Sequence, residues 1–188
     1  MDPRSNGAES LQHALVSYLP SRLGRFLDQL RIQLVPECQP RAHVTLLPPR
    51  LLPGSEQEAW LWIQDYCRKL SAFELEITRV AVFELSSVVY LELGVGRDAL
   101  IRIHEDLNVG PLYFNEPYRY HPHITLAQDL IAGQVEEKAA EAHRLWAGMR
   151  FPRFFPVEEL VFVRSTGNNR WVDLGSIQLQ KTPAATLF

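Results

Sequence analysis

The chain has 188 residues, enough for one domain with a sizeable core, and 46% of them are hydrophobic against 22% charged. The formal net charge of −3 argues against a protein that wraps a long stretch of nucleic acid, yet it permits a pocket for one or two nucleotides. Two cysteines without metal-like spacing, no apolar run of membrane-spanning length and no signal-peptide core at the start indicate a soluble, cytoplasmic protein.

The first half of the chain predicts strands and helices in alternation. Residues 1–10 are polar and expected to be flexible. A strand over 13–19 precedes a helix that Ser21 can cap, and a second strand over 42–47 is stopped by Pro48-Pro49. A capping box from Ser55 to Glu58 predicts a helix to about residue 70, and period-two alternation predicts strands over 73–84 and 87–93.

The second half repeats this order. A helix beginning at Asp98 and ending near Gly110 precedes a strand over 118–127, a helix over 134–146, and strands over 157–164 and 171–179 around a hairpin turn at 166–169. No linker-like stretch separates the halves. The predicted fold class is therefore α+β: one bilobal domain over 1–188, with interwoven, pseudo-twofold duplicated lobes. Two antiparallel sheets should line a central groove, with the helices outside.

Two tetrapeptides of the same form stand eighty residues apart, His43-Val44-Thr45-Leu46 and His123-Ile124-Thr125-Leu126. In a strand, side chains alternate between two faces, so each His shares a face with its Thr while the apolar pair faces the core. A single His-x-Thr is most often an ordinary strand. Its repetition in both halves favours a functional pair.

The chemistry of these side chains suits cleavage of a phosphodiester. Two imidazoles on opposite sides of a phosphorus can act as base and acid, and two hydroxyls can hold the non-bridging oxygens. The pattern needs no metal and no cofactor. One His must be neutral and the other charged, which predicts a bell-shaped pH profile, but the sequence does not decide which is the base.

With Pro122 before it and Ala127 after it, the second motif resembles closely the one that gives the 2H phosphoesterase superfamily its name. That group includes the bacterial 2'-5' RNA ligase-like proteins, and the resemblance covers nearly the whole chain and implies the same fold. It implies that His43 and His123 transfer protons and that Thr45 and Thr125 bind phosphate. The implied substrate is an RNA end, either a 2',3'-cyclic phosphate opened to a 2'-phosphate or a 2'-5' linkage, with 2'-5' ligation as the reverse reaction.

The chain departs from the family pattern in its nearby cations. The family often has Arg two positions after the second motif's Leu, where this chain has Gln128, and Pro48-Pro49 stand where a Lys is common after the first motif. Arg50 is the nearest cation there. These departures leave two alternatives open: a phosphodiesterase for another small cyclic phosphoester, or a nucleotide- or RNA-binding module without turnover.

Other side chains are secondary candidates. Tyr120 and Phe83 are candidates to stack on a base, although aromatic residues at such places are more often core. Arg164, or Arg170 with Trp171, would reach the groove as an anion or base contact, or else brace the hairpin. His121 and His123 form a His-Pro-His pair that a metallohydrolase would use, which predicts sensitivity to chelators. A monomer is expected, because one chain completes the groove.

Overall fold

The computed structural model describes residues 11–38, 41–131, 133–167 and 170–181. Residues 1–10, Pro40 before the first motif, and Asn168 and Asn169 of the predicted hairpin turn lie outside this range. Within it, the first half contains β1 (His13–Tyr18), α1 (Ser21–Leu34), β2 (His43–Arg50), α2 (Glu56–Cys67), β3 (Phe73–Phe83) and β4 (Val88–Leu93). The second contains α3 (Arg97–Leu107), the short 3-10 helix η1 (Gly110–Leu112), β5 (His123–Ala127), α4 (Gln134–Ala147), β6 (Phe154–Val157), β7 (Glu159–Gly167) and β8 (Arg170–Gln178).

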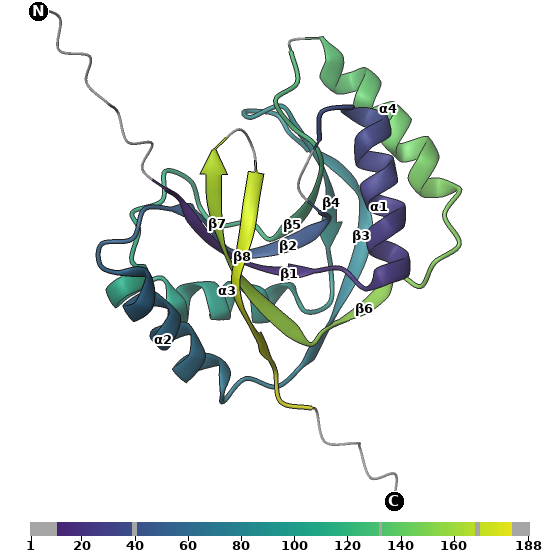
Figure 1. The fold of residues 1–188 in the computed structure, drawn as a ribbon. Coiled ribbons are helices and arrows are strands. Elements are labelled where there is room, and N and C mark those ends of the chain that lie inside the picture. The colour runs from purple at the N-terminus through teal and green to yellow at the C-terminus, as the bar shows by residue number, and fades with distance from the viewer. Residues whose placement is uncertain (1–10, 39–40, 132, 168–169, 182–188) are drawn as a thin grey trace, which may run out of the picture.

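The strands form two antiparallel sheets of four, in the orders β2-β1-β7-β8 and β5-β4-β3-β6. The lobes are interwoven, because β1 pairs with β7 from the end of the chain and β3 joins the sheet of the second motif. Helices α1 and α4 pack together over the sheet of β3, β4 and β5, while α3 contacts β2 and α2 contacts β8 (Figure 1). This arrangement confirms the predicted α+β fold.

Both motif strands are sheet edges, and they contact each other between the two sheets. The apolar residues of the motifs, Val44, Leu46, Ile124 and Leu126, are completely buried in a core that continues through both sheets. Their His and Thr neighbours are only half-buried. The period-two alternation of the sequence therefore holds, and it turns the polar side of both strands away from the core.

Two predicted helix caps are wrong. Pro20 occupies the N-cap position of α1, so Ser21 is already the first helical residue and makes no side-chain cap bond. Gly96 caps α3 with a φ of 82°, and Asp98 lies in the first turn, where its carboxylate complements the helix dipole. At Ser55 the capping box is confirmed, since the hydroxyl accepts from the Glu58 backbone and the Glu58 carboxylate accepts from the Ser55 backbone.

Several strand boundaries differ from prediction. β2 continues through Pro48-Pro49 to Arg50, since an edge strand tolerates residues without a backbone N–H. β5 begins at His123, five residues later than predicted, after an irregular segment. The sequence analysis missed β6, a four-residue edge strand whose alternation is too short to detect. Helix α2 ends at Cys67 rather than near residue 70. Across the described residues, the structure has no helix long and apolar enough to span a membrane.

Candidate functional site

A groove of about 1900 Å³ runs between the two sheets, and both motifs open into it. The half-buried side chains of both sequence motifs line it: His43, Thr45, His123 and Thr125. The two pairs come from edge strands of different sheets. The fold thus brings together residues eighty positions apart, which the sequence pattern alone could not do.

The two motif histidines are oriented in the same way. Nδ1 of His43 lies 2.6 Å from the Arg41 carbonyl oxygen, and Nδ1 of His123 lies 2.7 Å from the His121 carbonyl oxygen. A carbonyl oxygen can only accept, so each Nδ1 carries the proton and donates it. In a neutral ring Nε2 is then unprotonated, and it can take up a proton or, once protonated, deliver one.

Burial lowers the pKa of both imidazoles. The pKa of His43 falls to about 4, mainly by desolvation, with the Arg31 and His123 charges lowering it further and the Arg41 carbonyl and Asp28 opposing them. The pKa of His123 is also lowered, mainly by desolvation. The hydrogen bond to the His121 carbonyl raises this pKa, and the charge of the His121 ring lowers it. Both rings are therefore mostly neutral near pH 7 while the groove holds no anion. A bound phosphate would raise both pKa values.

The groove has an apolar floor with aromatic side chains around it. Ala14, Val16 and Val163 form part of a small buried cluster on the first sheet, against which Tyr18 and Trp171 pack. Trp171, one of the predicted contacts, thus lines the groove. Charged side chains adjoin this apolar surface, since the Arg41 guanidinium lies over the Tyr18 ring and the Tyr18 hydroxyl donates to Asp173 at 2.6 Å.

The other two predicted aromatic residues also line the groove, but they have protein partners. Phe83 stacks on Tyr90 with ring centroids 3.9 Å apart, and the His123 ring meets it edge-on at 5.0 Å. Tyr120 stacks on His104 at 3.9 Å and donates its hydroxyl proton to the Thr45 carbonyl at 2.7 Å. Phe83 thus packs against the His123 ring, and Tyr120 bonds to the backbone of the first motif strand.

Arg164 is not brought to the groove lining that the structure describes. Its guanidinium donates to the Glu56 carboxylate at 2.9 Å, and the same oxygen lies 2.9 Å from Nε2 of His13. This group ties the start of α2 to the first sheet. This role differs from both predicted alternatives, because the Arg164 side chain braces helix α2 and not the hairpin.

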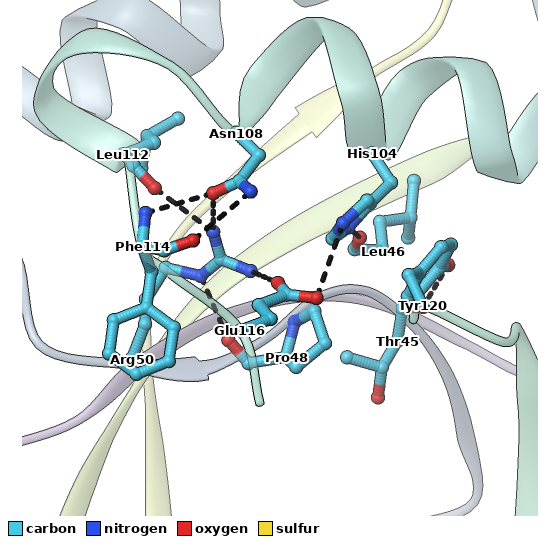
Figure 2. A network of polar contacts seen from close by, with 10 residues as sticks. All are labelled: Thr45, Leu46, Pro48, Arg50, His104, Asn108, Leu112, Phe114, Glu116 and Tyr120. Atoms are coloured by element: carbon cyan, nitrogen blue, oxygen red, sulfur yellow. Dashed lines mark hydrogen bonds and ion pairs between the residues drawn. The ribbon is translucent and has the colours of Figure 1, made fainter. Parts of the chain in front are cut away.

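Arg50, the nearest cation to the first motif in sequence, is also turned away from the groove. Its side chain is 1% exposed and donates to Pro48, Asn108, Leu112 and Glu116 (Figure 2). Burial with so many partners makes it part of the protein interior.

The groove takes its cations from several distant segments, and only Arg170 among them was a candidate from the sequence. They come from α1, the loops before β2 and β5, α4 and β8: Arg31, Arg41, Arg119, Lys138 and Arg170. Arg31 is only 4% exposed, and its charge acts on His43. Local spacing gave no signal for the other four, because these residues meet only in the folded chain. Gln128 lines the groove beside Asp129 without adding charge.

The predicted His121–His123 pair is close in space, with ring centroids 6.4 Å apart. Within the described part of the chain, no group of three or more His, Cys, Asp or Glu side chains is arranged to hold a metal ion. The His123 ring nitrogen Nδ1 is already occupied by the His121 carbonyl.

Comparison with proteins of known sequence and structure identifies relatives. A curated protein named "Putative phosphoesterase BH1439", from Halalkalibacterium halodurans, is 26% identical over 104 residues, which span 50% of this chain and 60% of that protein. E. coli LigT complexed with NADP+ superposes with a TM-score of 0.61 at 20% identity, covering 92% of this chain and 99% of LigT. The protein TT0787 of Thermus thermophilus gives 0.62 at 17% identity, covering 90% of this chain and 98% of its own.

At these identities the two solved structures establish the fold alone. The family follows from the sequence, because the model of the 2'-5' RNA ligase superfamily matches residues 19–169, most of the chain. The chain therefore belongs to the 2'-5' RNA ligase superfamily.

Proposed function

We propose that this protein is a metal-independent phosphodiesterase that opens the 2',3'-cyclic phosphate at an RNA end to a 2'-phosphate. One observation carries the proposal: His43 and His123 have the same ring orientation, fixed by backbone carbonyls, and line one groove together with Thr45 and Thr125. Acid–base catalysis across a phosphate requires two such proton carriers on one site.

The reaction balances with these groups alone. One imidazole takes a proton from water, whose oxygen attacks the phosphorus, while the other imidazole gives its proton to O3' as the P–O3' bond breaks. The product is a 2'-phosphate with a free 3'-hydroxyl, and the proton taken up replaces the proton delivered. The Thr hydroxyls stabilise the charge on the non-bridging oxygens. With a 5'-hydroxyl in place of water, the same attack would form a 2'-5' linkage as the P–O3' bond breaks. In reverse, attack by the 3'-hydroxyl would cleave a 2'-5' linkage, restoring the cyclic phosphate and releasing the 5'-hydroxyl.

The surroundings of the motifs support a nucleotide substrate. The floor of Ala14, Val16 and Val163 with Trp171 offers apolar and aromatic surface for a base, and the groove cations offer partners for phosphates. E. coli LigT, which shares the fold, has been crystallised with 3'-AMP and with phosphate. At about 1900 Å³ the groove exceeds the ~300–1,000 Å³ of typical small-molecule pockets, which favours a chain end over a single nucleotide.

The test is an assay in EDTA with a short RNA that ends in a 2',3'-cyclic phosphate, followed by analysis for a 2'-phosphate. His43→Gln and His123→Gln should each lower the rate about 10²–10⁴-fold. His143→Gln, at an exposed position on α4, is the matched control and should keep the wild-type rate.

Three outcomes would contradict the proposal in different ways. Loss of wild-type activity in EDTA would point to the metal hypothesis. Turnover of a mononucleoside 2',3'-cyclic phosphate but not of RNA would indicate a smaller phosphoester. Binding of the RNA without any product would identify a binding module.

A further inference from the structure

The first motif strand is held from outside its sheet by a polar network that starts and ends on that strand. We propose that Tyr120, through its hydrogen bond to the Thr45 carbonyl, is a positioning residue that fixes the Thr45 hydroxyl relative to the second motif. This inference rests on the proposed function for its catalytic consequence, but the contacts themselves are independent of the substrate.

Two backbone carbonyl groups of β2 accept hydrogen bonds from side chains of this network. The Tyr120 hydroxyl donates to the Thr45 oxygen at 2.7 Å, and Nδ1 of His104 donates to the Leu46 oxygen at 2.9 Å. Because β2 is an edge strand, its outward-facing carbonyl groups have no neighbouring strand to bond with. Side chains from other segments must supply those hydrogen bonds. The two bonds fall on the motif itself.

The donors are rigidly supported. The Tyr120 and His104 rings stack in nearly parallel planes, 9° apart, and Nε2 of His104 lies 3.4 Å from the Glu116 carboxylate. That carboxylate pairs with the Arg50 guanidinium at 2.5 Å, and Arg50 ends β2. Figure 2 shows the resulting circuit of polar contacts, which leaves the strand at Arg50 and returns to it at Leu46, with the Tyr120–Thr45 bond beside it; the stacked rings join the two.

The circuit also connects the two motifs. Tyr120 lies three residues before His123, on the segment that leads directly into β5. A displacement of this segment therefore moves both the Thr45 carbonyl and the second motif. In-line transfer between two imidazoles depends on such spacing, because an error of about 1 Å can cost about 10²-fold in rate.

The decisive variant is Tyr120→Phe, which removes the hydroxyl and keeps the ring that stacks on His104. Its matched control is Tyr66→Phe, which removes a hydroxyl that donates to Asp106 at 2.9 Å on the protein surface. We expect kcat to fall about 10-fold in Tyr120→Phe with KM changed less than about 2-fold, and neither to change in the control. Wild-type kcat in Tyr120→Phe would overturn the proposal. So would a raised KM with unchanged kcat, because that would indicate direct substrate binding by the hydroxyl.

A double-mutant cycle tests whether the effect passes through Thr45. In a Thr45→Val background, Tyr120→Phe should lower kcat by less than about 2-fold, because the hydroxyl that it positions is already gone. A full 10-fold further loss would show that Tyr120 acts by another route and would overturn the proposed link.

Amide hydrogen exchange separates this inference from the proposed function. If the wild type does not cleave the RNA, the proposed function fails. The hydrogen bond from Tyr120 to the Thr45 carbonyl still predicts faster exchange at residues 44–47 in Tyr120→Phe than in Tyr66→Phe. Equal exchange in the two variants would overturn the positioning role of Tyr120, whatever the substrate is.

Discussion

Replacing Arg50 by Met tests whether the network behind the first motif is an interior part of the fold. Met keeps most of the length of the stem and removes the guanidinium, with its bonds to Pro48, Asn108, Leu112 and Glu116. The Arg50 side chain is 1% exposed and that of Glu116 is 12% exposed, so the substitution leaves a carboxylate with little access to water.

The magnitude follows from this burial. Removing one partner of a buried ion pair costs about 3–5 kcal/mol, because the remaining charge is desolvated and unpaired. His104 has its Nε2 3.4 Å from the same carboxylate and can partly compensate by taking up a proton, so we expect the lower end, about 3 kcal/mol. For a chain of this length that is about 6–12 °C in Tm.

The measurement is urea and thermal unfolding, with Arg79→Met as the control. Arg79 makes an ion pair with Glu92 at 2.6 Å, nearly as close as the buried pair, but its side chain is 70% exposed, so its loss should hardly change the midpoint. The double variant Arg50→Met with Glu116→Leu should recover part of the loss, because it removes the stranded charge. Equal losses in Arg50→Met and Arg79→Met would refute the reasoning.

Three further outcomes are expected. The pH profile of kcat/KM should reach its maximum below pH 6.5, because burial lowers the pKa of both His43 and His123. The rate falls at high pH as the acid loses its proton, and at low pH as the base gains one. An optimum above pH 7 would contradict this. Thr45→Val and Thr125→Val should each lower kcat about 10-fold or more, checked by single-turnover hydrolysis; unchanged rates in both would exclude the hydroxyls from phosphate binding. Ser55→Ala should lower Tm by about 2–4 °C in a thermal scan through loss of the capping box of α2, and an unchanged Tm would show that the cap adds nothing.

The local pattern of the chain was sufficient for most of the secondary structure. The alternation in Val44 and Leu46 against Thr45 predicts a strand with one buried face, and the structure buries both apolar residues completely. The predicted caps at Ser21 and Asp98 failed because a neighbouring Pro or Gly took the cap position, a competition between adjacent residues that a pattern search does not weigh. Short β6 was missed for lack of periodicity.

Sequence by itself determined the family and fold, and it selected the two His-x-Thr motifs, because repeated motifs and strand alternation are local properties of the chain. Only the tertiary structure decided which cations face the groove. Arg50, on the same strand as the first motif, lies in the interior, whereas Arg31 and Arg170, from distant segments, line the groove. The physical reason is that burial and pairing depend on residues contributed by other elements, such as Glu116 for Arg50, and no spacing along one strand encodes them.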